Sequence, residues 1–99
     1  MIIDKTKENG KITLAIDGKL DTITAPQLQD VLISSIGEAM QIELDFTKLS
    51  YVSSAGLRTL LLGQKAAEAK GASMILSGVS EEVLEILDIT GFVDILTIV

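Results

Sequence analysis

The amino-acid sequence predicts an α/β domain of the order β-β-α-β-α-β-α-β, with three helices and a mixed, mostly parallel sheet that starts in an N-terminal hairpin. Three observations support it: two strand-like runs flank an early turn signal, later strand-like runs alternate with helical ones, and glycines mark most boundaries. Strands separated by helices need crossover connections, which make them parallel. With 99 residues, the chain is expected to be one domain, residues 1–99.

The hairpin prediction rests on Asn9-Gly10, because both residue types tolerate the positive φ angles of a two-residue turn. Residues 2–7 before this turn are weakly patterned and are expected to form an edge strand. Apolar residues occupy every second position of residues 12–16 after it, which predicts a strand with one apolar face.

The first helix is expected to begin at Thr24, with Gln27 completing a capping box, and to end at Gly37 in the C′ position. Alternating residues 42–46 predict the next strand, and residues 48–53 are expected to form a loop.

A long second helix follows and is closed by Gly71. Its Leu60-Leu61-Leu62 run is assigned to the core rather than to a partner groove, with Leu62 partly exposed. Residues 73–77 enclose three consecutive apolar residues, which is typical of a strand covered on both faces. Ser80 is expected to cap a third helix that stops at Gly91, and residues 95–99 to form a last short strand.

The charge argues against nucleic acid and membrane surfaces as partners. Eight basic and 14 acidic residues give a formal net charge of −6, which repels phosphate backbones and anionic lipid heads. Aromatic residues make up only 3% of the chain and leave few rings for base stacking. Such a chain suits a basic or mixed surface on another protein.

The chain contains no cysteine and no histidine, which fits a reducing compartment. No apolar run approaches the roughly 18 residues of a membrane span, and the charge at Asp4 comes too early for a signal peptide. A cytoplasmic location is therefore expected.

Function is expected at the carboxyl ends of the strands, in the segments 18–23 and 48–55. Ser53 and Ser54 precede the longest helix, where unpaired N–H groups and the positive dipole end can hold a phosphate. Gly56, without a Cβ atom, lets another backbone approach closely. These properties suit a phosphorylation site within a contact surface. The alternative is that Ser53 or Ser54 only caps the helix.

The motifs resemble those of the STAS domain family, specifically of stand-alone bacterial anti-sigma factor antagonists. Members carry Asp-Ser-Ser/Thr-Gly-Leu-Gly after a strand that ends in Asp-hydrophobic-Ser/Thr. The corresponding segments here are Ser53-Ser54-Ala55-Gly56-Leu57-Arg58 and Asp45-Phe46-Thr47. The family's Gly-x-Leu-Asp run matches Gly18-Lys19-Leu20-Asp21. Further matches are Ala25, Leu28 and Gly71, so the resemblance spans the whole chain and implies a STAS-like fold.

The resemblance implies that Ser54 accepts phosphate, with the adjacent Ser53 as the less favoured candidate because it replaces the family's aspartate. It also implies a partner-binding surface, made of Asp21, Thr22, Ser53, Ser54, Ala55, Gly56 and Arg58. Arg58 replaces a small residue one helical turn from Ser54. It can pair with the phosphate or with an acid on a partner, or remain a solvated surface residue.

The partners implied are an anti-sigma factor with serine kinase activity, which binds the unphosphorylated chain and releases it on phosphorylation, and a serine phosphatase that resets the cycle. No catalysis, cofactor or metal is expected of the chain itself, and a monomer is expected. The alternative is a STAS-type adaptor or ligand-sensing module in another signalling assembly. The chain's start at Met1 and end at Val99 favour a free-standing unit.

Three acids are expected near the serines: Asp17, Asp21 and Asp45. Such a cluster can hold Mg²⁺. The favoured interpretation is that Asp21 and Asp45 accept loop N–H groups while Asp17 is a turn residue. A serine hydrolase is disfavoured because the chain offers no histidine as a base and no Gly-x-Ser-x-Gly elbow. A metal-dependent hydrolase that uses the carboxylates is a further alternative.

Overall fold

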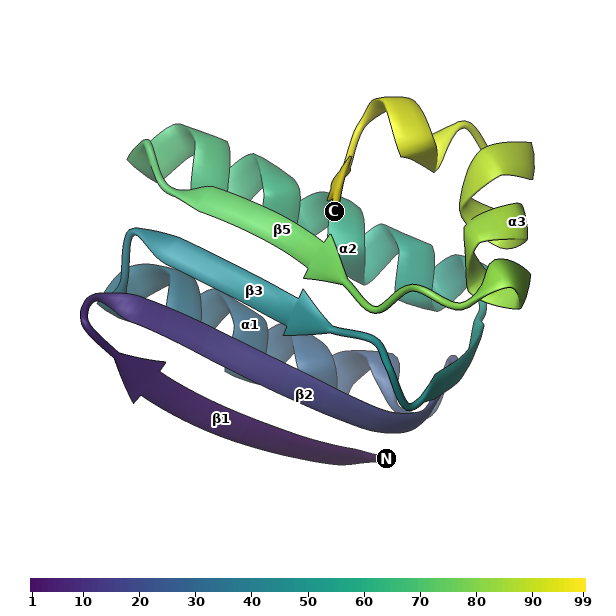
Figure 1. Cartoon of the computed structure of the whole chain (residues 1–99), viewed down its shortest axis with the longest axis horizontal. Coiled ribbons are helices and arrows are strands. Elements are labelled where there is room, and N and C mark those ends of the chain that lie inside the picture. The colour runs from purple at the N-terminus through teal and green to yellow at the C-terminus, as the bar shows by residue number, and fades with distance from the viewer.

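The chain folds into one sheet with two long helices on one of its faces and a short helix at its end (Figure 1). The structure is a computed structural model that describes residues 1–99. The elements in chain order are β1 (Ile2–Glu8), β2 (Lys11–Leu20), α1 (Ala25–Glu38), β3 (Gln41–Asp45), β4 (Leu49–Val52), α2 (Ser54–Lys70), β5 (Ser73–Ser77), α3 (Glu81–Ile89), a 3₁₀ turn (Phe92–Asp94) and β6 (Thr97–Ile98).

The sheet has the strand order β1-β2-β3-β5-β6, and β4 pairs with the end of β2. Only the β1–β2 pair is antiparallel; all other pairs are parallel. The mixed, mostly parallel sheet with an N-terminal hairpin is thus confirmed. Asn9 and Gly10 have φ angles of 51° and 78°, as a tight hairpin turn requires.

The predicted loop over residues 48–53 is wrong, because Leu49–Val52 form β4. This strand pairs with β2 at Gly18–Leu20, beyond the last residue that β2 pairs with β3. Its inward residues are Leu49 and Val52, while Ser50 and Tyr51 between them are exposed. A four-residue strand without alternation offers no period to recognise.

The predicted capping box of the first helix is also wrong. Thr24 makes no cap hydrogen bond into α1; its Oγ1 accepts from the N–H of Asp21 at 2.9 Å and donates to Lys19 O at 2.7 Å. Gln27 Nε2 donates to Met1 O at 3.4 Å instead of reaching back to the helix start. At the other end, the helix continues through Gly37 to Glu38, and Ala39 is its C-cap.

The end of α2 and both ends of α3 follow the prediction. Gly71 ends α2 in the left-handed region with a φ angle of 79°, and the Ser80 hydroxyl accepts from the Val83 N–H at 3.2 Å. The third helix stops at Ile89, just before Gly91. The predicted last strand over residues 95–99 is shorter, because Ile95 is the C-cap of the 3₁₀ turn and only Thr97–Ile98 pair with β5.

The expectation that residues 73–77 are covered on both faces is wrong. Met74 and Leu76 are buried, whereas Ile75 is only half-buried, because α1 and α2 cover one face of the sheet and α3 lies at its end (Figure 1). The core of 22 apolar residues therefore lies between the sheet and the helices, with Leu60 fully buried. Of the Leu60-Leu61-Leu62 run assigned to the core, only Leu60 belongs to it: Leu61 is half-buried, and Leu62 is 40% exposed, as predicted for Leu62. None of the helices combines the length and the apolar composition that a membrane span requires.

Candidate functional site

The two serines lie at the start of α2, at the end of the molecule to which the carboxyl ends of β2, β3 and β5 point (Figure 1). Two backbone hydrogen bonds fix this position. The Ser53 N–H donates to Leu20 O at 2.8 Å, and the Leu57 N–H donates to Ser53 O at 2.9 Å. Helix α2 therefore starts directly beside the last residue of β2.

Ser53 is the N-cap of α2. Its backbone is extended, with φ −87° and ψ 174°, and its Oγ accepts from the Gly56 N–H at 3.3 Å. This is the bond that an N-cap serine makes with the third helical residue. The capping alternative is thus confirmed for Ser53, and the Ser53 hydroxyl is engaged within the chain.

Ser54 differs from Ser53 in its position in the helix and in the bonding of its hydroxyl. It is the first helical residue, it is exposed, and its hydroxyl takes part in no hydrogen bond of the chain. The N–H groups of Ser54 and Ala55 belong to those that helix geometry leaves without an intrahelical acceptor. A negatively charged group on Ser54 Oγ would therefore lie at the positive end of the helix dipole.

Gly56 is buried against the chain's own β2. A Cβ atom on Gly56 would lie 2.7 Å from Leu20 Cγ and 2.9 Å from Leu20 O. The close backbone approach predicted for Gly56 is therefore made by Leu20, within the fold. The absent side chain allows α2 to begin against the end of β2, which presents Ser54 at the surface.

The segment from Asp21 to Thr24 lies next to the serines, because it follows Leu20 directly. Asp21 Oδ1 accepts from the N–H groups of Ile23 and Thr24, both at 3.0 Å. The Thr24 N–H is the main cause that lowers the pKa of Asp21 below its ordinary value. The prediction that Asp21 shapes this loop is confirmed. Thr22 is exposed at its tip.

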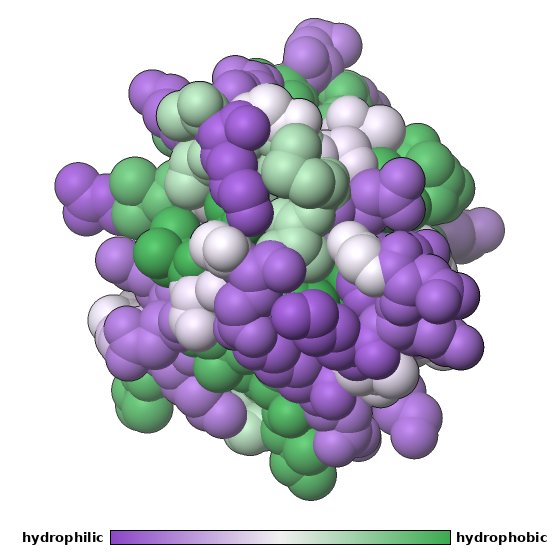
Figure 2. All heavy atoms as spheres, turned by 90° about the vertical axis from the view of Figure 1, so that its left-hand side faces the viewer, coloured by the Kyte–Doolittle hydropathy of each residue, from purple (hydrophilic) through white to green (hydrophobic).

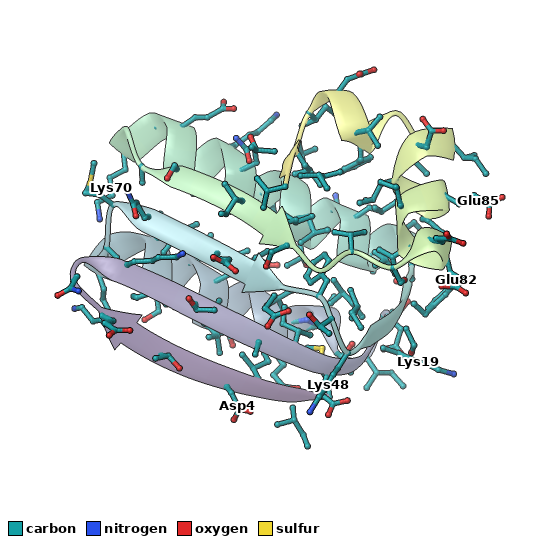
Figure 3. The ribbon with its side chains drawn as sticks, in the orientation of Figure 1. Asp4, Lys19, Lys48, Lys70, Glu82 and Glu85 are labelled. Carbon is teal, nitrogen blue, oxygen red and sulfur yellow. The ribbon has the colours of Figure 1, made fainter.

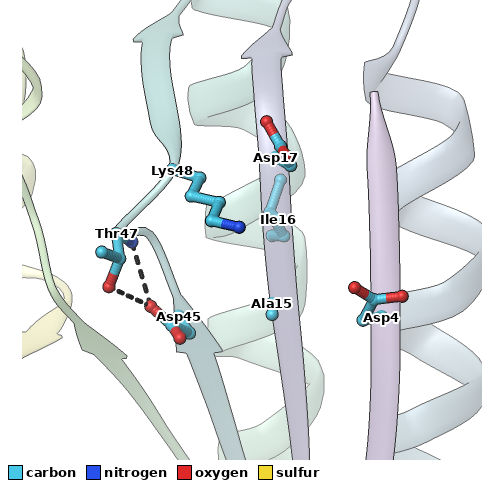
Figure 4. Close-up of a pocket in the computed structure, with 7 residues that line it drawn as sticks. All are labelled: Asp4, Ala15, Ile16, Asp17, Asp45, Thr47 and Lys48. Carbon is cyan, nitrogen blue, oxygen red and sulfur yellow. Dashed lines mark hydrogen bonds between the residues drawn. The ribbon is translucent and has the colours of Figure 1, made fainter.

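Asp45 has the same kind of role in the next loop. Its Oδ1 accepts from the Thr47 N–H at 3.0 Å and from the Thr47 hydroxyl at 2.6 Å (Figure 4). The hydroxyl bond, followed by the N–H bond, lowers the pKa of Asp45. Asp45 therefore accepts a loop N–H, as predicted.

The predicted gathering of three acids is wrong. Asp45 and Asp17 line a shallow hollow of about 260 Å³ together with Asp4, whereas Asp21 is not part of it. Asp17 is not a turn residue: it lies within β2, opposite Ile2. The Lys48 side chain extends across this hollow toward β2 (Figure 4). No three acidic side chains lie close enough together to hold a metal ion.

Arg58 lies four residues after Ser54 in α2, so the two side chains share a helix face. It is exposed and belongs to neither of the two ion pairs, which join Lys5 to Glu38 and Lys11 to Glu43. Ala55, between the two serines and Gly56, is half-buried. A free guanidinium one turn from the serine can pair with an anion there.

The sequence reasoning missed two exposed residues beside the serines. Ile23 is 87% exposed in the Asp21–Thr24 segment, and Tyr51 is 45% exposed on β4, where it pairs with Lys19. An isoleucine within an otherwise polar turn, outside any apolar period, was the available signal for Ile23. Figure 3 shows Lys19 projecting from the same end of the molecule.

The opposite end of the molecule also exposes a large apolar side chain, because Met40 before β3 is 50% exposed. Figure 2 faces that end, and its hydrophobic areas are small and separated from one another by hydrophilic residues. The predicted site residues lie at the other end, which carries the exposed Ile23, Tyr51 and Arg58.

The chain is similar to known proteins in sequence and in fold. The anti-sigma-B factor antagonist of Bacillus subtilis is 28% identical over 96 residues, which cover 97% of this chain and 88% of that protein. An anti-sigma factor antagonist from Mycobacterium paratuberculosis has a similar structure, with a TM-score of 0.82 at 16% identity over 98% of this chain and 83% of that one. The phosphorylated form of the Bacillus cell fate determinant SpoIIAA gives 0.77 at 19% identity, over 99% and 91%.

The STAS domain family matches residues 3–99, which include all six strands and all three α-helices except the first residue of β1. The match contains the Gly18–Asp21 run, the serine pair and Gly56, so the two segments that meet at the start of α2 both lie within it. The chain belongs to the STAS domain family.

Proposed function

We propose that this chain is an anti-sigma factor antagonist that is switched by phosphorylation of Ser54. The observation that carries the proposal is that the two adjacent serine hydroxyls have different roles. The Ser53 hydroxyl caps α2, whereas Ser54, the first residue of α2, is exposed and its hydroxyl makes no hydrogen bond. A kinase can therefore esterify Ser54 without breaking the cap. The relatives named as anti-sigma factor antagonists supply the class of partner.

The unphosphorylated chain binds an anti-sigma factor through the surface formed by Asp21, Thr22, Ser53, Ser54, Ala55, Gly56 and Arg58. Gly56 is buried and contributes indirectly, because it lets α2 pack against Leu20. The exposed residues of the surface contact the anti-sigma factor. The anti-sigma factor is also the serine kinase and holds the ATP, so this chain has a regulatory rather than a catalytic role.

Phosphorylation adds a charge of about −1.5 to −2 at neutral pH. In the free chain this charge is tolerated, because it lies at the α2 N-terminus and one helical turn from Arg58. In a complex the same charge must be desolvated, and it adds to a chain that already carries −6. Weakening a complex from nanomolar to micromolar affinity requires about 4 kcal/mol. Burying a charge that lacks its partner reaches that magnitude.

The released chain is monomeric, and a serine phosphatase returns it to the binding form. Because the phosphorylated serine is at the surface, the phosphatase can reach it without unfolding α2.

The test uses the purified chain and the serine-kinase anti-sigma factor of the same organism, with ATP and Mg²⁺. Tandem mass spectrometry locates the phosphate, and surface plasmon resonance compares the affinities of both forms. We expect phosphate on Ser54 and an affinity at least about 100-fold lower, which corresponds to roughly 2.7 kcal/mol. Ser54→Ala should bind and stay unmodified, and Ser54→Asp should bind weakly.

A matched control is Ser50→Ala, because Ser50 is an exposed serine on the neighbouring β4. This variant should be phosphorylated and released like the unchanged chain. Phosphate on Ser53 would overturn the site assignment. Equal affinities of the two forms would overturn the switch itself.

A further inference from the structure

The charge of the chain is concentrated in its last third. Residues 71–99 contain five acidic residues and no lysine, arginine or histidine, so they carry −5 of the formal charge of −6. Residues 1–70 carry the remaining −1. Four of the five acids lie on α3, namely Glu81, Glu82, Glu85 and Asp88. Glu82 and Glu85 project outward from this helix (Figure 3).

One face of α3 combines these acids with an apolar floor. Positions 81, 84, 85 and 88 have the spacing of a single helix face. Together with Val93 of the 3₁₀ turn they line a groove of about 470 Å³. Leu84 is 41% exposed in this groove, and Leu84 and Val93 are its apolar residues. Three carboxylates therefore surround an apolar strip.

The acids of this groove have no cation within the chain. Both ion pairs of the protein involve other elements. Glu81 and Glu85 are like charges four positions apart, and Asp88 lies in the last turn of a helix that has no basic residue there. Both arrangements are unfavourable, the first by direct repulsion and the second against the negative end of the helix dipole.

We infer that the α3 groove, lined by Glu81, Leu84, Glu85, Asp88 and Val93, docks a basic amphipathic segment of a partner protein. The partner's apolar side chains lie on Leu84 and Val93, and its lysines or arginines pair with the carboxylates. A second copy of this chain does not fit, because a symmetric contact would place acid against acid. The inference goes beyond the serine switch, since it needs no phosphate on Ser54.

The probe is a fluorescein-labelled helical peptide with leucines on one face and lysines on both flanks of that face. Fluorescence anisotropy measures its affinity for the full chain at about 50 mM and about 300 mM salt, because charge pairing weakens as the Debye length shrinks. We expect binding that weakens about tenfold or more at the higher salt concentration. A second peptide, with serine in place of every leucine, should bind at least about tenfold more weakly.

The test variants are Glu85→Lys and Leu84→Ser. Both should lose most of the peptide affinity. Glu85→Lys should keep or raise the melting temperature, because it replaces the repulsion with Glu81 by an attraction in the favourable order. The matched control is the double variant Asp30→Lys/Glu68→Lys, which changes two exposed acids on α1 and α2. It alters the net charge more than Glu85→Lys does and should bind nearly as well as the unchanged chain.

Three outcomes would overturn the inference: no binding by the unchanged chain, equal binding of the serine peptide, or an equal loss in the Asp30→Lys/Glu68→Lys control. The last two would mean that only the overall charge attracts the peptide.

Discussion

Gly56 and Leu20 are packed so closely that no Cβ atom fits between them. The nearest atoms to a Cβ on Gly56 would be Leu20 Cγ at 2.7 Å and Leu20 O at 2.9 Å. Leu20 O is the acceptor of the Ser53 N–H, so it cannot move without disturbing the start of α2. The position of the serine pair depends on this contact.

Gly56→Ala should therefore destabilise the chain by about 1–3 kcal/mol, as expected for overpacking against a fixed backbone atom. Urea unfolding followed by circular dichroism measures the loss. Gly37→Ala is the matched control, because Gly37 also lies in a helix but a Cβ there would meet no atom within 4 Å. It should stabilise the chain by roughly 0.5–1 kcal/mol. Equal effects of both variants would contradict the packing argument.

Removing the N-cap should cost stability at either capped helix. Ser53→Ala and Ser80→Ala each delete a hydroxyl that accepts a backbone N–H of the first turn, at 3.3 and 3.2 Å. Each variant should lower the free energy of unfolding by about 0.5–2 kcal/mol. Ser54→Ala, which removes no hydrogen bond, should change it by less than about 0.5 kcal/mol. A larger loss for Ser54→Ala than for Ser53→Ala would reverse the assigned roles.

A negative charge on the first residue of α2 should stabilise the free chain. Ser54→Asp places a carboxylate at the positive end of the helix dipole and one turn from Arg58, worth about 0.3–1 kcal/mol. Thermal unfolding at low salt measures the gain, and Ser54→Asn provides the uncharged comparison. The gain should shrink at high salt and in the Ser54→Asp/Arg58→Ala double variant. A destabilised Ser54→Asp would show that the charge is not accommodated there.

The bonds to Asp45 predict a loss of stability in acid. Its pKa is lowered in the folded chain by the Thr47 hydroxyl and N–H, from an ordinary value of 3.8. A lowered folded pKa gives a stabilisation that is present above the unfolded pKa and is lost as the pH falls through the folded pKa. Asp45→Asn should flatten the decline of the melting temperature below about pH 4. An unchanged decline would mean that Asp45 contributes nothing to it.

Much of the fold follows from local signals in the sequence. The hairpin turn at Asn9-Gly10, the Ser80 cap and the end of α2 at Gly71 each depend on one or two residues whose backbone chemistry permits few alternatives. These features were predicted correctly because the determinant and the structure lie at the same place in the chain.

The wrong predictions depend on contacts between distant residues. Gln27 has the side chain that completes a capping box, but it donates to Met1 O, 26 positions away in the chain. Leu49–Val52 become a strand only because β2 extends beyond β3 and offers a free edge. Ile75 sits in an apolar run, yet its face of the sheet receives no helix. No pattern within those segments reports the distant partner.

The candidate site shows the same division. That a serine begins the second helix could be predicted, and the capping geometry then distinguished Ser53 from Ser54. The separation of Asp21 from Asp45 and Asp17 could not be predicted from the sequence. It depends on the order of the strands in the sheet and on the hollow that Lys48 crosses.

The bond between the Ser53 amide and Leu20 ties the beginning of α2 to the strand in the middle of the β1-β2-β3 ladder. Because this hydrogen bond holds the start of α2, the helix has little freedom to shift or unwind when Ser54 is phosphorylated. The unphosphorylated and phosphorylated forms should then have the same backbone conformation. A partner would distinguish them by the electrostatic potential of the surface and not by its shape.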